Sequence, residues 1–215
     1  MCGIVGVVGN SNAVDILIQG LEKLEYRGYD SAGIYVTDAP DKGCLVKSVG
    51  RIADLRAKIS SDVKGSTGIG HTRWATHGQA TEDNAHPHTS ETGRFVLVHN
   101  GVIENYLQIK EEYLQGHKFK GQTDTEIAVH LIGKFVDEDG LSVLEALKKS
   151  LHIIQGSYAF ALVDSQAPDT IYVAKNKSPL LIGVGEGYNM VCSDAMAMIR
   201  ETSQFMEIHD KELVF

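Results

Sequence analysis

The chain has 215 residues, of which 43% are hydrophobic and 22% are charged, and its formal net charge is −8. This length suffices for one sizeable domain with a buried core. No long basic block occurs, which disfavours nucleic acid and anionic membranes as partners. The apolar start is too short for a secretory leader or a membrane span. Three widely spaced cysteines, Cys2, Cys44 and Cys192, favour a reducing, cytoplasmic setting.

The predicted elements fall into three groups along the chain. The first group is a glycine-punctuated strand at 3–9, a helix at 14–24 with leucines and isoleucines at helical spacing, and strands at 33–37, 45–49, 67–72 and 94–99. A long polar loop, 78–93, separates the last two of these strands, and loops of this length inside compact domains are usually functional.

Helices follow at 105–115, 125–136 and 141–151, and the second starts at a capping box formed by Thr123 and Glu126. The third group consists of short strands bounded by turn signals, at 158–164, 170–174, 180–184, 190–193, 206–208 and 213–215. Strands at both ends with helices between them predict an α+β fold with antiparallel sheets.

Cys2 is a candidate nucleophile because only Met1 precedes it. Cysteine is small enough for methionine aminopeptidases to remove a preceding methionine, so we expect the mature chain to begin at Cys2. A free thiol titrates near ~8.5 and an α-amine near ~7.7–8.0, so the amine can accept the thiol proton at neutral pH. From position alone, an equally good interpretation is that Cys2 merely starts an apolar strand.

Asn100 and Gly101 are candidate oxyanion donors. They follow the apolar run Phe95–Val98, and we expect them where that strand breaks into a turn. A side-chain amide beside a backbone N–H could bind a developing oxyanion. Asn-Gly is also a common turn dipeptide, and the dipeptide alone favours that simpler interpretation.

The segment 71–78 concentrates groups suited to recognition. Arg73 can grip a carboxylate bidentately, and Thr76 and His77 can add hydrogen bonds. Arg73 and Trp74 taken alone would more often form a surface cation–π pair. Asp124 stands at a helix start, where it either complements the helix dipole or pairs with a substrate ammonium. These groups together fit a free amino acid whose side-chain carbonyl is attacked; glutamine fits, while asparagine and simple esters stay open.

Several motifs also carry a family resemblance that covers essentially the whole chain, in order. They are the segments Cys2–Gly6, Tyr26–Gly33, His71–Gly78, His86–His88, His99–Gly101 and Thr123–Glu126. With these the chain resembles the class II glutamine amidotransferases. The resemblance implies the N-terminal-nucleophile (Ntn) hydrolase fold, an αββα sandwich of two antiparallel sheets between helical layers.

The resemblance also implies roles for residues. Cys2 would attack the glutamine amide with its own amine as base, Arg27 would order the N-terminal residue, and Asn100 with Gly101 would bind the oxyanion. Trp74 would belong to a mobile loop over the substrate. The expected substrate contacts are Arg73, Thr76 and His77 on the α-carboxylate side and Asp124 on the α-ammonium.

Residues 1–215 would form one glutaminase domain that needs no cofactor and no metal. The most similar members continue into a sugar-phosphate isomerase region, absent from this chain, in which the ammonia serves amino-sugar synthesis. A homodimer would form through the full-length enzyme. We therefore expect this chain to hydrolyse L-glutamine without making an amino sugar by itself.

Two other function classes are weighed against this one. A metal hydrolase could use the histidines at 71, 77, 86, 88 and 99, although no metalloprotease or paired-cysteine spacing supports it. A non-catalytic glutamine-binding module could keep the pocket without turnover, but every expected catalytic group is retained.

Overall fold

The computed structural model describes residues 2–75 and 78–215. Its helices are α1 (Ala13–Leu24), α2 (Ile52–Lys58), α3 (Tyr106–Tyr113), α4 (Asp124–Asp137) and α5 (Val143–Ile153), with short 3-10 helices η1 (Glu25–Arg27) and η2 (Ala195–Ala197). Its strands are β1 (Gly3–Val8), β2 (Ser31–Thr37), β3 (Cys44–Val49), β4 (Thr67–Arg73), β5 (His88–Thr89), β6 (Phe95–Ile103), β7 (Gly156–Asp164), β8 (Ile171–Asn176), β9 (Leu181–Val184), β10 (Asn189–Cys192), β11 (Phe205–Glu207) and β12 (Leu213–Val214).

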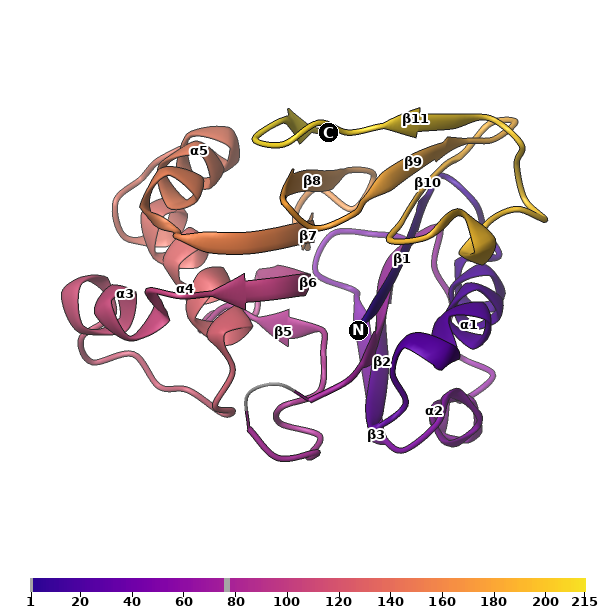
Figure 1. Ribbon diagram of the computed structural model, residues 1–215, viewed down its shortest axis with the longest axis horizontal. Helices are drawn as coiled ribbons and strands as arrows, with labels where there is room; N and C mark the ends of the chain where they lie inside the picture. The colour runs from indigo at the N-terminus through magenta and orange to yellow at the C-terminus, as the bar shows by residue number, and fades with distance from the viewer. Residues whose placement is uncertain (1, 76–77) are drawn as a thin grey trace.

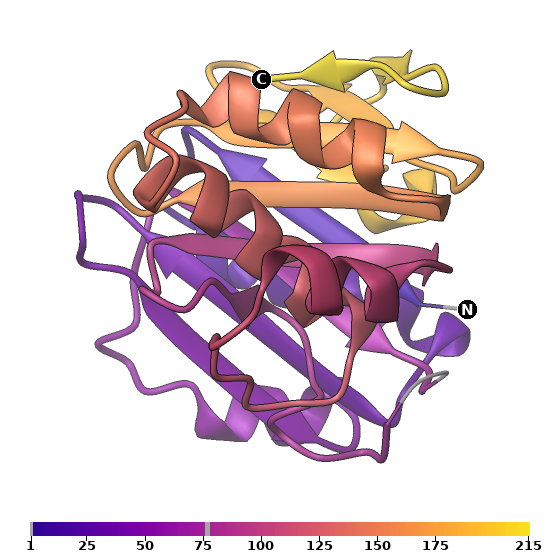
Figure 2. The same ribbon diagram turned by 90° about the vertical axis from the view of Figure 1, so that its left-hand side faces the viewer.

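The described strands form two antiparallel sheets between two layers of helices. One sheet has the order β11-β9-β10-β1-β4-β2-β3 and the other β12-β8-β7-β6-β5. Helices α1 and α2 lie on one side of the molecule and α3, α4 and α5 on the other (Figure 1). Figure 2 views the second helical layer face on, in front of its sheet. The α+β sandwich expected from the sequence is confirmed.

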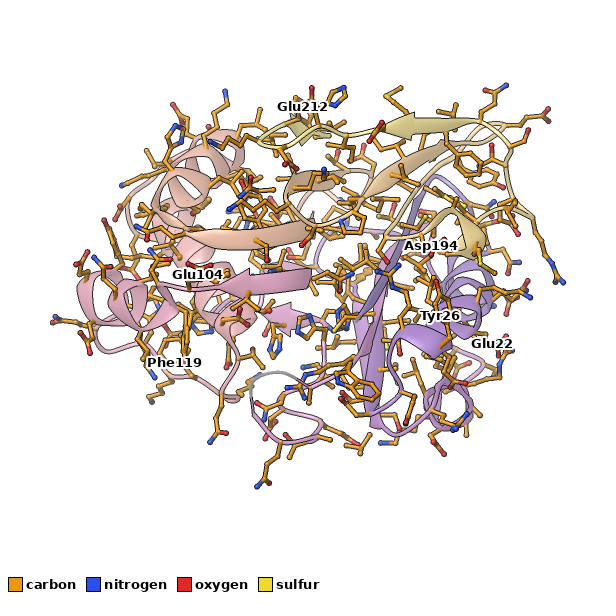
Figure 3. The ribbon with its side chains drawn as sticks, in the orientation of Figure 1. Glu22, Tyr26, Glu104, Phe119, Asp194 and Glu212 are labelled. Carbon is orange, nitrogen blue, oxygen red and sulfur yellow. The ribbon has the colours of Figure 1, made fainter. Side chains whose placement is uncertain are left out.

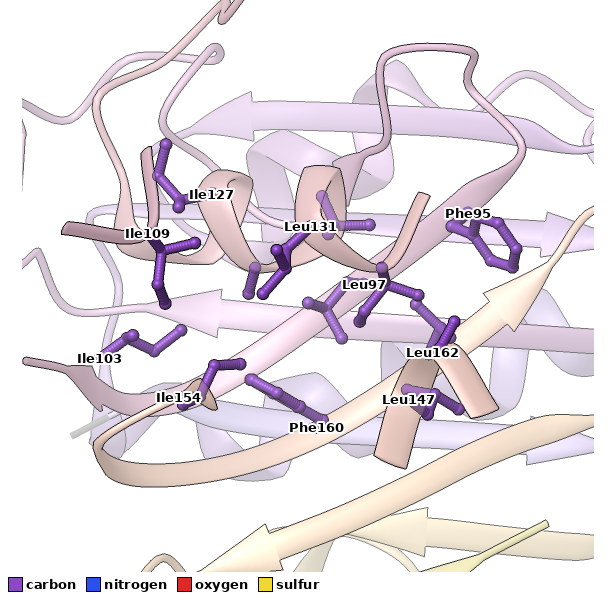
Figure 4. Close-up of a cluster of buried hydrophobic side chains, with 14 of the residues drawn as sticks. Phe95, Leu97, Ile103, Ile109, Ile127, Leu131, Leu147, Ile154, Phe160 and Leu162 are labelled. Carbon is purple, nitrogen blue, oxygen red and sulfur yellow. The ribbon is translucent and has the colours of Figure 1, made fainter. Parts of the chain in front are cut away.

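Three clusters of buried apolar side chains hold these layers together. The cluster between the sheets includes Ile4, Ile69, Val96 and Val98, which are at most 1% exposed. A second cluster packs α1 and α2 on the first sheet. The third joins α3, α4 and α5 to the second sheet, and Figure 4 shows its members from Phe95 to Leu162. Burial of apolar surface on both faces of each sheet is the main stabilising contribution.

One helix and one strand end differ from the sequence expectations. Helix α2 is absent from the predicted elements. It has only seven residues, of which Ile52 and Leu55 are buried. Two apolar positions are too few to show helical periodicity. The strand expected at 94–99 continues to Ile103, so Asn100 and Gly101 do not lie in a turn. Because β7 pairs with β6 along its whole length, the sheet overrides the turn preference of the Asn-Gly dipeptide.

The topology places the start of β1 beside the end of β4. Gly3 pairs with Thr72 in the antiparallel register, so Cys2 comes next to Arg73 and Trp74. None of the described helices combines the length and the apolar character needed to cross a membrane.

Candidate active site

A cavity of about 300 Å³ opens where the start of β1, the ends of β4 and β6 and the N-terminus of α4 meet. It is lined by Cys2, Arg27, Arg73, Trp74, His86, His99, Asn100, Gly101, Val102, Thr123, Asp124, Thr125, Ser178 and Pro179. Seven of the nine predicted site residues are therefore brought together. The other two, Thr76 and His77, lie outside the described residues.

Cys2 is held by its backbone and leaves its thiol at the cavity wall. Its carbonyl oxygen accepts hydrogen bonds from Arg27 Nε at 3.0 Å and from Asn100 Nδ2 at 3.2 Å. The Trp74 backbone N–H donates to Cys2 Sγ at 3.3 Å. Burial raises the pKa of the thiol, while the Trp74 hydrogen bond opposes this shift. The thiol therefore needs a base to reach its nucleophilic form at neutral pH.

Arg27 owes its position to η1 and to a carboxylate from a distant segment. Its Nη1 lies 3.4 Å from Asp194 Oδ2, an oxygen that also accepts a hydrogen bond of 2.7 Å from the Tyr26 hydroxyl. Tyr26 and Asp194 lie side by side in Figure 3. Three groups thus fix the guanidinium: the Cys2 carbonyl, Asp194 and the short helix that carries it.

Asn100 is oriented by a buried histidine on β4. His71 Nε2 lies 3.0 Å from Asn100 Oδ1 and 3.1 Å from the His99 carbonyl oxygen. Both partners are acceptors, so Nε2 carries the proton. Burial lowers the pKa of His71 to about 3, which keeps the ring neutral. The amide oxygen of Asn100 is thereby bound away from Cys2 and its NH2 group faces the Cys2 backbone.

Gly101 occupies a backbone conformation that favours glycine. Its φ is 135° within β6, and a Cβ at this position would lie 2.1 Å from the Ser157 carbonyl oxygen. No other residue fits without displacing β7. The conformation arises inside a continuous strand rather than in the expected turn, and it exposes the backbone at the cavity rim.

Arg73 and Trp74 are braced by the motif at 26–33. Arg73 is buried, donates to the carbonyl oxygens of Gly78 and Gln79 at 3.3 and 3.2 Å, and lies 3.9 Å from Asp30. Asp30 also accepts a hydrogen bond from the Ala75 N–H. The Trp74 ring, on a residue that is 49% exposed, packs edge-on against Tyr29 at 5.6 Å.

Asp124 begins α4 and points into the cavity region. Its Oδ2 accepts a hydrogen bond of 2.8 Å from the Ile103 N–H, and Oδ1 has no hydrogen-bond partner among the described residues. Thr123 caps the helix by accepting from the Glu126 N–H at 3.2 Å. The reciprocal half of the expected capping box is wrong, because the Glu126 carboxylate binds the N–H groups of Lys120 and Gly121 instead.

Comparisons with known proteins agree with this geometry. The sequence pattern of the family described as "Glutamine amidotransferase domain" matches residues 71–200, which is more than half of the chain. The chain belongs to this glutamine amidotransferase family. It is therefore a domain of an enzyme.

Close relatives of this glutamine amidotransferase domain carry the name glutamine–fructose-6-phosphate aminotransferase [isomerizing]. The protein from Streptococcus pyogenes serotype M1 is 86% identical over 214 residues, and that from Streptococcus pneumoniae strain R6 is 82% identical over the same length. The match covers 100% of this chain but 35% of each relative. The chain thus spans about a third of the length of these proteins.

Solved structures give the same fold. The glutamine phosphoribosylpyrophosphate amidotransferase from B. subtilis, complexed with ADP and GMP, superposes with a TM-score of 0.84 at 30% identity, covering 97% of this chain and 46% of that one. A structure described as the allosteric regulatory enzyme of purine biosynthesis has the same TM-score at 31% identity and covers 98% of this chain and 45% of that one. The expected Ntn-hydrolase sandwich is confirmed.

Four histidines of the glutamine amidotransferase domain form a buried polar layer at the cavity wall, and two of them, His86 and His99, line the cavity. The rings of His71 and His86 stack at 4.0 Å, and that of His88 meets His86 edge-on at 4.7 Å. His86 Nδ1 accepts from the His99 N–H, while His88 and His99 hydrogen-bond Thr123 and Thr125. Burial lowers the pKa of His86 and of His88 well below the usual range. The rings of His71, His86 and His88 are therefore neutral hydrogen-bonding groups in this arrangement.

Several residues at this site are not among those predicted from the sequence. Asp30 and His71 both lie inside motifs that carry the family resemblance, at 26–33 and 71–78. Those motifs are the sequence signal that indicates them. His86 lines the cavity, whereas the sequence indicates it only as part of the motif at 86–88 and as a candidate metal ligand. Ser178 and Pro179 line the cavity from the turn after β8, and a Ser-Pro turn gives no sequence signal for such a position.

Proposed function

We propose that this chain hydrolyses the side-chain amide of L-glutamine to glutamate and ammonia, with Cys2 as the nucleophile. The observation that carries the proposal is the meeting of a thiol, a fixed amide donor, a guanidinium and a carboxylate around one cavity of about 300 Å³. A free amino acid presents the complementary groups: an amide carbonyl to attack, a carboxylate and an ammonium.

Activation of Cys2 needs a proton acceptor, since burial raises the pKa of its thiol. We assign this role to the Cys2 α-amine, which removal of Met1 would create. An α-amine near ~7.7–8.0 can take the proton at neutral pH, directly or through one water. The Trp74 N–H, 3.3 Å from Sγ, would stabilise the thiolate before attack.

The oxyanion would be bound by the Asn100 amide and the Gly101 N–H. One hydrogen of Asn100 Nδ2 already binds the Cys2 carbonyl oxygen, and the other is available to the substrate. His71 prevents the amide from turning its oxygen toward the oxyanion. A donor of this kind typically stabilises the transition state by ~2.7–4 kcal/mol.

The substrate would be oriented by charge at its amino-acid end. Arg73 would bind the α-carboxylate, and the available oxygen of Asp124 would bind the α-ammonium. Trp74 would cover the bound glutamine, and Thr76 and His77 stay predictions as further contacts. Fixing both ends of the α-carbon brings the side-chain amide to Sγ in one orientation.

The chemistry then proceeds in two balanced steps. Sγ forms a bond to the amide carbon, the proton from the thiol passes through the amine to the leaving nitrogen, and ammonia departs to leave a γ-glutamyl thioester. Water, deprotonated by the same amine, then attacks the thioester carbon, releases glutamate and restores the thiol.

The fate of the ammonia follows from the relatives. The name of these proteins contains both glutamine and fructose 6-phosphate. We therefore propose that residues 1–215 form the glutaminase domain. The part of such proteins beyond this span would use the ammonia to make an amino sugar. Pairing of subunits through that part and a cytoplasmic location stay predictions, the latter resting on three free cysteines among the described residues.

A glutaminase assay with Cys2→Ala as the comparison tests the proposal. We expect the wild-type chain to release glutamate and ammonia in equal amounts and to form an acid-stable γ-glutamyl adduct on Cys2, detectable by intact mass. The variant should bind glutamine without turnover. Binding without turnover in the wild type would instead identify a glutamine-binding module.

A further inference from the structure

A second cluster of ligand-type side chains lies away from the cavity, on the side of α3 and α4. It consists of Glu91 in the β5–β6 connection, His117 after α3, and His130 within α4. One ligand atom from each lies within 4.8 Å of the others. Phe119, whose ring is 4.7 Å from that of His130, marks this region in Figure 3, across the molecule from Tyr26 and Asp194.

His130 is the first sign of a missing partner. The residue is 3% exposed, and its Nδ1 is buried without a hydrogen-bond partner among the described residues. Buried polar atoms are nearly always paired, so an orphaned ring nitrogen calls for an explanation such as an ion.

His117 gives the second sign. Its Nδ1 lies 2.8 Å from Glu91 Oε2, yet this buried nitrogen makes no hydrogen bond, because the contact does not follow the direction of an N–H bond. A short contact between an imidazole nitrogen and a carboxylate oxygen that lies outside hydrogen-bond geometry is what two neighbouring ligands of one metal ion show. Its Nε2 lies at an ion-pair distance of 3.1 Å from Glu138 Oε1, which places a carboxylate near the far nitrogen, where metal-bound histidines usually have an outer partner.

We propose that Glu91, His117 and His130 bind one divalent transition-metal cation, and that zinc is the ion this donor set favours. Two imidazoles and one carboxylate form a familiar zinc ligand set, with the remaining position left for water. Magnesium and calcium prefer oxygen ligands throughout and fit less well. The ion ties the β5–β6 connection and the segment after α3 to α4, the helix that begins at Asp124.

Zinc titration of the full chain by calorimetry, after chelator treatment and its removal, tests the proposal. We expect the wild-type chain to bind one zinc ion. His117→Gln and Glu91→Gln should each bind zinc at least tenfold more weakly than the wild type. Glu91 is exposed, so its variant folds whatever the effect at the buried histidines. His152→Gln, on an exposed histidine of α5, is the matched control and should bind zinc as the wild type does.

Two further measurements complete the test. Cobalt added in place of zinc should give the visible absorption of a nitrogen- and oxygen-ligated ion, and Glu91→Gln should weaken it. Because Cys2 is an alternative zinc ligand, Cys2→Ser is titrated as well and should keep the site. Absence of stoichiometric zinc binding, equal affinity in Glu91→Gln and wild type, or loss of binding in Cys2→Ser alone would overturn the proposal.

Discussion

His71 Nε2 lies 3.0 Å from Asn100 Oδ1, and this one contact decides which end of the amide faces Cys2. The ring is neutral because burial lowers its pKa to about 3, and its protonated Nε2 can donate to the oxygen of the Asn100 amide but cannot accept from its NH2 group. The oxyanion donor is therefore set in place before substrate arrives.

Replacing His71 with Phe should lower kcat for glutamine hydrolysis while changing KM little. The amide oxygen of Asn100 would then lose the partner that fixes its direction, leaving only the Nδ2 contact to the Cys2 carbonyl oxygen, and the loss approaches that of one oxyanion donor, roughly 10²–10³-fold in kcat. Steady-state kinetics on folded variants measures this. Because His71 acts through Asn100, adding His71→Phe to Asn100→Ala should cost little more, whereas additive losses would refute the link.

Retention of Met1 should abolish glutaminase activity. The Cys2 nitrogen would then be an amide with no basicity, while the raised pKa of the thiol leaves little thiolate at neutral pH. The two forms can be separated and identified by intact mass, then assayed side by side. Equal turnover in both forms would exclude the α-amine as the base.

Asp124→Asn should raise KM for glutamine by about 10- to 100-fold, the equivalent of a charged hydrogen bond of ~1.5–3 kcal/mol. The asparagine oxygen can still accept from the Ile103 N–H, so the start of α4 is preserved. The matched control is the glutamine analogue that lacks the α-amino group: wild type and variant should hydrolyse it equally. A variant defect that persists with this analogue would show a role other than ammonium binding.

The histidine layer should make the fold sensitive to mild acid. The pKa values of His71, His86 and His88 are lowered by burial, so below about 6.5 the unfolded chain gains protons that the folded chain does not. The free energy of unfolding should then decrease by up to about 1.4 kcal/mol for each histidine with every unit by which the pH is lowered. Urea unfolding at pH 7.5, 6.5 and 5.5 measures how the free energy of unfolding changes with pH. This change should be smaller in His88→Asn. A stability independent of pH across this range would contradict the prediction.

Local sequence features were sufficient to predict the layout of elements and most of the chemistry. Periodic leucines predicted α1, strands clustered at the two ends predicted antiparallel sheets, and the motifs at 2–6, 26–33, 71–78, 99–101 and 123–126 supplied the site residues. These features are local, because each depends on a few neighbouring side chains and on turn chemistry. The long helix α4 was predicted to within one residue of its start for the same reason.

Which groups meet depends instead on contacts between distant segments of the chain. Pairing with β7 carried β6 through Asn100 and Gly101 to Ile103, against the local preference of Asn-Gly for a turn. The pairing of Gly3 with Thr72 set Cys2 beside Trp74 across 72 positions of chain. Glu91, His117 and His130 show no metal-binding spacing, since three separate segments bring them together. Contacts between distant segments depend on how the sheets and helices pack, and no short stretch of sequence encodes that.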